Sequence, residues 1–329
     1  MMADHAPTVA VVLPAWNVGP FIDDALASVA AQTRPADEVI LVDDASSDDT
    51  VERARQWCDR LPLRIIELDQ NVGCGAARSV AIRAASADLI APFDGDDVWL
   101  PNHLAVVSAC VVDERTIVAT KQLQWSGGSA DEAVPDWLDV PPPERQADAI
   151  LDHDFLYSGS VYWRKTLLEH GGGPSDLRTG EDYDTWIRLI WNAGCVAVPT
   201  PEPTVLYRSR PGSLSADEGC LVGTIDMFRR YLHDEVIAAP PEHLRRLIRR
   251  REARRQFVDA LATAEAGHPG RARRQLIAAA AHDPTLWGGF RPAEQGSVLL
   301  RAIPALAAPG RVADRRREQL QSNHNPDDR

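Results

Sequence analysis

Three carboxylates surround one glycine at Asp94-Gly95-Asp96-Asp97, directly after the short apolar run that ends at Phe93. This pattern is typical of a buried strand that ends in a turn, the edge where open α/β sheets place their ligands. Carboxylates without a balancing cation repel one another, and their hard oxygen atoms suit Mg²⁺ or Mn²⁺ shared with substrate phosphates. The alternative is a solvated acidic turn, because short Asp/Gly clusters are common in loops.

Pro14-Ala15-Trp16-Asn17 is a second motif, and it follows the β-branched apolar run of residues 8–13. The indole of Trp16 is suited to stacking on a nucleotide base, whose edge the neighbouring backbone groups would read. The alternative is a tryptophan that caps the hydrophobic core.

Two acids, Asp43 and Asp44, end the next apolar run at residues 38–42. For Asp44 we expect binding to ribose hydroxyls or to a base N–H in the crevice beyond the strand. The alternative is structural, with Asp43 capping a turn and Ser47 or Asp48 capping the following helix, and we favour the structural interpretation for Asp48 and Asp49.

Residues 71–78 place Gly73 and Gly75 at the start of a small-residue helix, with Arg78 one turn inside it. A helix N-terminus attracts anions, so a diphosphate or a base would be bound here. The segment lacks the Gly-Lys-Ser/Thr ending of a P-loop, and a Rossmann fingerprint would follow the first strand instead.

The elements that position these motifs alternate between strand and helix over the first hundred residues. We expect strands at 8–13, 38–42, 63–68 and 89–93. We expect helices at 21–32 and 73–85, and a third helix that begins at the cap residues 46–50 and ends at about residue 58. Such alternation predicts an α/β fold with a mostly parallel, doubly wound sheet and right-handed crossovers.

The pattern loosens after residue 99. We expect a long loop or lid at 126–147, short strands at 158–163 and 195–199, and helices at 185–192, 242–266 and 270–282. The change to Arg/Ala-rich helical sequence predicts two parts, a domain of residues 1–220 and a helical region of residues 221–329. The end of that region, residues 322–329, is expected to be a disordered tail.

The net charge of −13 is unevenly distributed. Residues 1–220 carry 16 basic and 35 acidic side chains, whereas residues 221–329 carry 19 and 13. The acidic part disfavours nucleic acid as a ligand, and phosphate binding there would need a cation. The basic part suits an acidic partner or weak contact with an anionic membrane surface, although solvated arginine-rich helices are the favoured interpretation.

The cysteines and the apolar runs bear on the compartment. No run approaches the roughly 20 apolar residues of a membrane span, and the first residues lack the pattern of a signal peptide. The five cysteines are an odd number without a CxxC pair. They predict a reducing, cytoplasmic environment and argue against a disulfide framework or a zinc site.

In their order along the chain, the four motifs closely resemble those of the family 2 glycosyltransferases. The resemblance covers residues 8 to about 215 and implies the GT-A fold and a nucleoside-diphosphate sugar donor, with UDP as the default. Two departures leave the chemistry intact, namely Ser79 where Asn is usual and Trp16 where Tyr is more usual.

The resemblance also implies roles for the matching residues. Asp96 and Asp94 would bind a divalent cation, Mn²⁺ or Mg²⁺, and Asp182 in the segment 180–184 would be the general base, with Asp184 a helix N-terminal charge. Arg208, with serines 213 and 215, would close over the diphosphate, and the alternative is a surface loop whose arginines have no such role. The nucleotide-sugar contacts would come from Pro14, Ala15, Trp16, Asn17, Asp44, Gly73, Arg78, Asp94, Gly95 and Arg208.

With one base and no second enzymic nucleophile, transfer to an acceptor hydroxyl is expected to invert the anomeric centre. One alternative is a nucleotidyltransferase, which should carry a Gly-rich loop with Lys or Arg after its first strand, and residues 16–19 match that poorly. The other is a non-catalytic sugar-nucleotide-binding protein. The joint presence of Asp44, Asp94, Asp96 and Asp182 argues against it.

Overall fold

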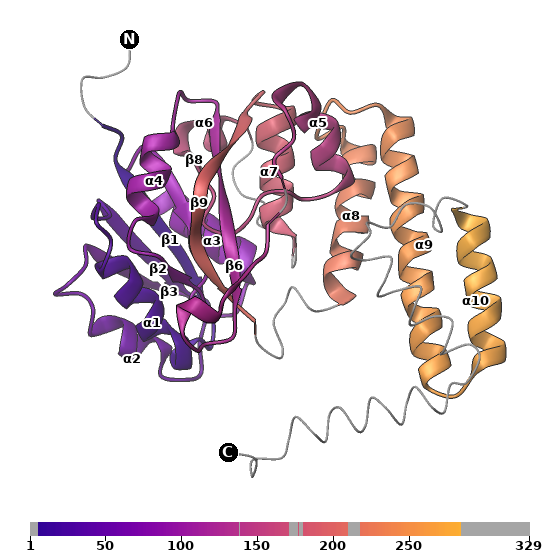
Figure 1. Ribbon diagram of the computed structural model, residues 1–329, viewed down its shortest axis with the longest axis horizontal. Coiled ribbons are helices and arrows are strands. Elements are labelled where there is room, and N and C mark those ends of the chain that lie inside the picture. The colour runs from indigo at the N-terminus through magenta and orange to yellow at the C-terminus, as the bar shows by residue number, and fades with distance from the viewer. Residues whose placement is uncertain (1–5, 138, 171–176, 178–179, 210–217, 284–329) are drawn as a thin grey trace. The chain divides into compact units, whose positions relative to one another are not determined.

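The computed structural model describes residues 6–137, 139–170, 177, 180–209 and 218–283. The chain forms two compact units, one of residues up to 227 together with 235–239, and one of residues 228–234 together with those from 240 onward (Figure 1). The serines 213 and 215 expected near the diphosphate, and the tail predicted to be disordered, lie outside the described residues.

The larger unit is built on a mixed sheet, in which the described residues form nine strands in the order β3-β2-β1-β4-β8-β6-β9-β5, with β7 paired to β6. The strands are β1 (Val9–Ala15), β2 (Glu38–Asp43), β3 (Leu63–Glu67), β4 (Leu89–Pro92), β5 (Val98–Trp99), β6 (Thr116–Trp125), β7 (Val134–Pro135), β8 (Val161–Trp163) and β9 (Val196–Arg208). The neighbours β3, β2, β1 and β4 are parallel, as predicted from the strand–helix alternation.

The second half of the sheet departs from the parallel pattern. β8 is antiparallel to both β4 and β6, and β5 is antiparallel to β9, while β9 is parallel to β6. The strand expected at 195–199 is longer than predicted and continues to Arg208. Its pairing with β6 has register irregularities between Ala119 and Gln122, where prolines 199, 201 and 203 interrupt the regular ladder.

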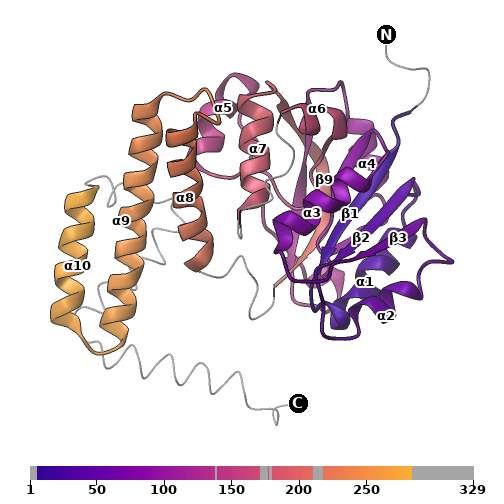
Figure 2. The same ribbon diagram turned by 180° about the vertical axis from the view of Figure 1, so that it is seen from behind.

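Helices cover both faces of the parallel half, with α1 and α2 on one face and α3 on the other (Figures 1 and 2). The helices of this part of the chain are α1 (Gly19–Ala30), α2 (Thr50–Arg55), α3 (Cys74–Ala84), α4 (His103–Cys110), α5 (Pro143–Asp152), α6 (Arg164–Glu169) and α7 (Glu181–Trp191), with a short 3₁₀ helix at Ala130–Glu132. The prediction of a long loop at 126–147 is partly wrong, because this segment contains the 3₁₀ helix, β7 and the start of α5. The prolines before residue 144 do not prevent α5 from forming, since proline is well tolerated at the first helical position.

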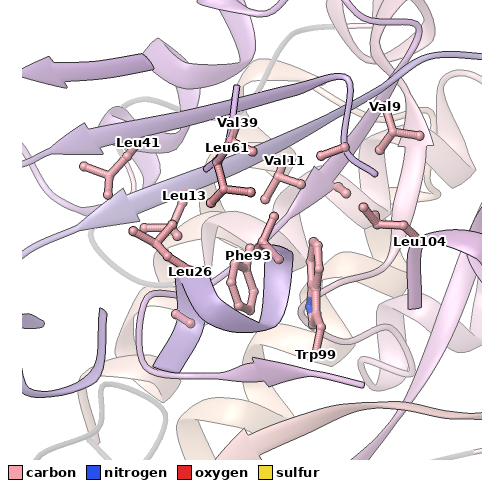
Figure 3. Close-up of a cluster of buried hydrophobic side chains, with 14 of the residues drawn as sticks. Val9, Val11, Leu13, Leu26, Val39, Leu41, Leu61, Phe93, Trp99 and Leu104 are labelled. Carbon is pink, nitrogen blue, oxygen red and sulfur yellow. The ribbon is translucent and has the colours of Figure 1, made fainter. Parts of the chain in front are cut away.

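One hydrophobic core cluster of the larger unit lies between the sheet and α1 (Figure 3). Val9, Val11 and Leu13 project from one face of β1, since alternate side chains of a strand share a face. Phe93 follows β4 and packs on Trp99 with ring centroids 4.3 Å apart. The acidic turn that lies between these two rings in sequence is therefore anchored to the core at both ends.

The smaller unit is helical and contains the last residues of α8 (Glu218–Asp234) together with α9 (Pro241–Glu265) and α10 (Pro269–His282). Small side chains let α9 and α10 pack closely around one phenylalanine; the buried cluster is Ala253, Phe257, Ala260, Leu276 and Ala279. The helices predicted at 242–266 and 270–282 are confirmed. Among the described residues we find no helix with the length and apolar character to cross a membrane.

Candidate active site

The carboxyl ends of β1, β2 and β4 meet at one edge of the sheet because the three strands are parallel. The strand register pairs Ala15 with Asp43 and Val12 with Pro92. The residues that follow each strand therefore lie side by side. Three of the predicted motifs come together at this edge.

Trp16 is 56% exposed at the end of β1. This exposure contradicts the alternative in which Trp16 caps the core, and it leaves an aromatic ring open to solvent. Pro14 and Ala15 are buried within β1, and the carbonyl of Ala15 accepts from the N–H of Asp44 at 2.8 Å. Ala15 thus joins the end of β1 to the loop after β2, and the expected ligand contacts of Pro14 and Ala15 stay predictions.

Asn17 joins the loops that follow β1 and β2. Its N–H donates to Ser46 Oγ at 2.9 Å, and its Oδ1 accepts from the N–H of Ser47 at 2.8 Å. The φ angle of Asn17 is 51°, in the left-handed region that asparagine tolerates better than most residues. The structure thus occupies the side chain of Asn17 with the neighbouring loop, and its expected ligand contact stays a prediction.

Asp44 holds the loop that precedes α3. Its carboxylate is 2% exposed and accepts from the N–H groups of Val72 at 2.7 Å and Gly73 at 2.8 Å. Gly73 has φ of 91°, a conformation that a side chain would strain. Asp44 therefore shapes the loop at the base of α3, and its expected nucleoside contact stays a prediction. The turn cap expected for Asp43 is observed, since Asp43 Oδ2 accepts from the N–H of Ser46 at 3.0 Å.

The acidic turn after β4 closes with a hydrogen bond from the N–H of Asp97 to the carbonyl of Asp94 at 3.1 Å. Its residues alternate in burial: Asp94 and Asp96 are partly exposed, whereas Gly95 and Asp97 are buried. A Cβ on Gly95 would lie only 3.1 Å from the Val18 side chain. Close packing on the core therefore explains the glycine, and the ligand approach expected at Gly95 stays a prediction.

Arg78 connects the acidic turn to the start of α7. Its Nη2 lies 2.7 Å from Asp94 Oδ1, and its Nη1 lies 2.6 Å from Glu181 Oε1. The guanidinium is largely buried, where a charge needs such partners to offset its lost hydration. Arg78 thus brings together two motifs that are far apart in sequence, whereas its expected contact with a diphosphate stays a prediction.

Asp182 is the second residue of α7, next to Glu181. Asp182 is exposed to solvent on one side, while the protein atoms packed around its carboxyl group reduce its hydration. This loss of hydration raises the pKa of Asp182, and the negative charge of Glu181 raises it further. The positive charge of Arg78 acts in the opposite direction, and the resulting pKa is about 6. A carboxylate with such a pKa is a competent proton acceptor near neutral pH. Asp184 is buried and bonded to Arg188 Nε at 2.6 Å, which agrees with a structural role.

Arg208 lies at the end of β9 and is 9% exposed. Its guanidinium bonds to the carbonyl of Asp96 and to the carboxylate of Asp24 on α1. The sequence predicted a contact between Arg208 and a diphosphate. The structure instead shows its side chain bound to the acidic turn, and the diphosphate contact stays a prediction.

Sequence reasoning assigned no role to two acids near Asp182. Glu181 was recognised only as part of a motif, and its link to Arg78 spans 103 positions. Asp154 follows α5 and accepts from the N–H of Leu156 at 3.0 Å. Burial, and then the charge of Asp182, raises the pKa of Asp154 well above its usual range. A single aspartate without a motif around it gives no sequence signal of this proximity.

The comparison with known proteins gives the family. The model of glycosyl transferase family 2 matches residues 10–170. TuaG of Bacillus subtilis (strain 168), named for teichuronic acid biosynthesis, is 34% identical over 226 residues, which are 66% of this chain and 85% of TuaG. The chain belongs to glycosyl transferase family 2. It is therefore a transferase enzyme.

Solved structures of glycosyltransferases share its fold. A fragment of S. aureus TarS in complex with UDP-GlcNAc has a TM-score of 0.60 and 18% identity, over 95% of this chain and 92% of the fragment. The mannosyltransferase PcManGT from Pyrobaculum calidifontis, in complex with GDP-Man and Mn²⁺, has a TM-score of 0.57 and 21% identity, over 94% and 83%. The predicted GT-A fold of this glycosyltransferase is thereby confirmed.

The acidic turn limits how this glycosyltransferase can hold a divalent cation. Among the residues described, no group of three or more His, Cys, Asp or Glu side chains is arranged to hold a metal ion. The turn does offer two partly exposed carboxylates, Asp94 and Asp96. Mg²⁺ and Mn²⁺ are commonly held by one or two carboxylates plus substrate phosphates, so these residues fit a cation shared with a bound diphosphate.

Proposed function

We propose that the enzyme transfers a sugar from a nucleoside-diphosphate sugar, with UDP as the expected nucleotide, to an acceptor hydroxyl, and that it inverts the anomeric centre. The observation that carries this proposal is the bridge of Arg78 between Asp94 and Glu181. Through this bridge, the acidic turn and the general-base candidate Asp182 belong to one charged cluster. A donor diphosphate and an acceptor hydroxyl need these two features close together.

The donor would lie along the carboxyl edge of the parallel strands. The exposed ring of Trp16 supports stacking on the base, and the loop that Asp44 holds at Gly73 would line the nucleoside. Asp94 and Asp96 would face the ribose and the diphosphate. A bound divalent cation would neutralise charge on the diphosphate, which the acidic protein cannot do alone.

The proposed chemistry uses one carboxylate of the chain. Asp182 accepts the proton from the acceptor hydroxyl, and the oxygen forms a bond to the anomeric carbon while the bond to the diphosphate oxygen breaks. The electron pair of the broken bond leaves with the diphosphate. A single displacement from the opposite face inverts the configuration, because no covalent enzyme intermediate is formed.

Binding of the donor nucleotide tests the proposed site directly. UDP should bind in the presence of Mn²⁺ and should lose most of its affinity when the metal is chelated, as measured by calorimetry. GDP in the same titration tests the choice of base. If no nucleoside diphosphate binds with Mn²⁺, the proposed function is wrong.

Replacement of Asp182 tests the proposed base. Asp182→Asn should lower kcat roughly 10²- to 10⁴-fold, because the amide cannot accept the proton, while the affinity for UDP and Mn²⁺ stays near that of the wild type. Asp148→Asn, at an exposed aspartate of α5, is the control and should keep the wild-type rate. Normal turnover of Asp182→Asn would remove Asp182 from this role.

We further propose that residues 1–220 form the catalytic domain and that the helical region from residue 221 is a separate part. The four cysteines whose side chains are described, Cys58, Cys74, Cys110 and Cys195, are free thiols. Free thiols support the proposal that the enzyme works in a reducing compartment such as the cytoplasm.

A further inference from the structure

Arg208 makes three hydrogen bonds that join the acidic turn to β9 and α1. Its Nε donates to the carbonyl of Asp96 at 2.6 Å, and its backbone N–H donates to Oδ1 of Asp97 at 2.8 Å. Its Nη2 donates to Oδ2 of Asp24 at 2.9 Å. Two of these three bonds end on the turn that presents the carboxylates of Asp94 and Asp96.

Aromatic rings and backbone enclose the guanidinium of Arg208. Its central carbon lies 4.3 Å from the ring centroid of Trp125 and 5.1 Å from that of Phe21. A Cβ on Gly127 would lie 3.2 Å from Nη1, so the backbone of the loop after β6 closes another side. A guanidinium in such a place loses hydration, and hydrogen bonds such as the one from Nε to the carbonyl of Asp96 compensate for that loss.

The bonds from Arg208 restrain the backbone of the acidic turn at Asp96, whose side chain is a proposed metal ligand. The carbonyl of Asp96 is held by Arg208, while the Asp96 side chain stays partly exposed. The next residue, Asp97, is 1% exposed and is held by the backbone N–H of Arg208. With the backbone fixed at both positions, the Cα–Cβ direction of Asp96 is fixed as well.

We propose that Arg208 is a positioning residue that holds the acidic turn in the conformation that binds a divalent cation together with a diphosphate. This inference rests on the proposed function and gives Arg208 a role that acts through Asp96 instead of direct contact with the donor. Groups that orient metal ligands typically change metal affinity by roughly 10- to 100-fold when they are replaced.

Arg208→Met and Arg208→Lys test the inference, with the same changes at Arg164 as matched controls. The Nε of Arg164 also donates to a main-chain carbonyl, that of Ile82 at 3.1 Å. Its backbone N–H donates to the carbonyl of Asp88, which precedes β4, whereas the acidic turn follows β4. The control therefore breaks the same kind of bond at the opposite edge of the sheet.

Three quantities are measured for each variant: the affinity for UDP with Mn²⁺ by calorimetry, the affinity for Mn²⁺ alone by water-proton relaxation, and the unfolding midpoint without metal. Arg208→Met should weaken both affinities at least ~10-fold at a temperature where the variant is fully folded. Arg208→Lys should weaken them less, since lysine keeps the charge and one donor position. The Arg164 variants should keep both affinities.

Several results would overturn the inference. Wild-type affinities in a folded Arg208→Met exclude a positioning role, and Arg208→Lys gives the same comparison if the methionine variant does not fold. Weaker UDP binding with unchanged affinity for Mn²⁺ alone indicates direct diphosphate contact instead. If the wild-type chain binds UDP with Mn²⁺, such results refute only the role of Arg208. If it binds none, the proposed function fails and the inference fails with it.

Discussion

Ala45 adopts a left-handed backbone conformation, with φ of 59°, in the loop between Asp44 and the start of α2. An alanine in this region is strained by roughly 1–2 kcal/mol, because its Cβ crowds the backbone. Glycine removes that strain but gives the unfolded chain more freedom, which costs about 0.4–1 kcal/mol. Ala45→Gly should therefore raise the free energy of unfolding by about 0.5 kcal/mol, measured by urea denaturation.

Ala27→Gly is the control for this change, since Ala27 lies within α1 in ordinary helical conformation. There the same replacement should lower the free energy of unfolding by about 1 kcal/mol. A loss of stability in Ala45→Gly as large as in Ala27→Gly would show that the loop is not strained at Ala45. The loop beside Asp44 thus holds Ala45 in a backbone conformation that alanine does not favour by itself.

At the scale of elements, the pKa of Asp182 depends on how α7, α3 and the acidic turn meet. As the proposed general base, Asp182 must be ionised to accept a proton, so kcat/KM should rise as the pH increases through about 6 and then level off. Glu181 raises this pKa, and Glu181→Gln should therefore move the rise to lower pH. The measurement is kcat/KM from pH 5 to 8, with UDP affinity over the same range as the control. An unshifted pH profile in Glu181→Gln would show that the charge of Glu181 does not influence the group whose ionisation controls kcat/KM.

The elements of the parallel half were predictable because each carries its own signal. Apolar β-branched runs and cap residues predicted β1 to β4 and α1 to α3, each of which the structure contains. The short strand predicted at 158–163 is present as β8, which has three residues. The strands β5 and β7 have two residues each, so they are too short to show a periodic pattern. They exist because distant partners in the sheet pair with them, which local sequence does not encode.

The residues of the candidate site were predictable from the sequence, but the ion pairs and hydrogen bonds between them were not. The acidic turn and Asp182 were predicted from motifs. Their link through Arg78 and Glu181 joins positions 103 apart, and the bond between Arg208 and Asp24 spans 184 positions. Such contacts follow from the way the strands and helices pack. Sequence reasoning therefore predicted ligand contacts for side chains that the structure pairs with other parts of the protein.

At the scale of the whole larger unit, a buried histidine couples folding to pH. His103 is fully buried, stacks on Trp99 with ring centroids 4.0 Å apart, and its Nδ1 lies 3.0 Å from Thr204 Oγ1. Burial lowers the pKa of His103 to about 3, from an ordinary value of 6.5. Between these two values the unfolded chain binds a proton at this histidine and the folded chain does not.

The free energy of unfolding should therefore fall as the pH drops from about 6.5 towards 3, by up to about 1.4 kcal/mol per pH unit from this residue. In His103→Asn an amide replaces Nδ1 beside Thr204 without a titrating group. The variant should be less stable at pH 7, because it loses the ring contact with Trp99, but its stability should depend less on pH between 6.5 and 4. Urea denaturation followed by tryptophan fluorescence reports mainly on this unit, which holds eight of the nine tryptophans. Equal pH slopes for the two proteins would show that His103 does not control acid unfolding, and that carboxylates whose pKa the fold lowers, such as Asp48, dominate it instead.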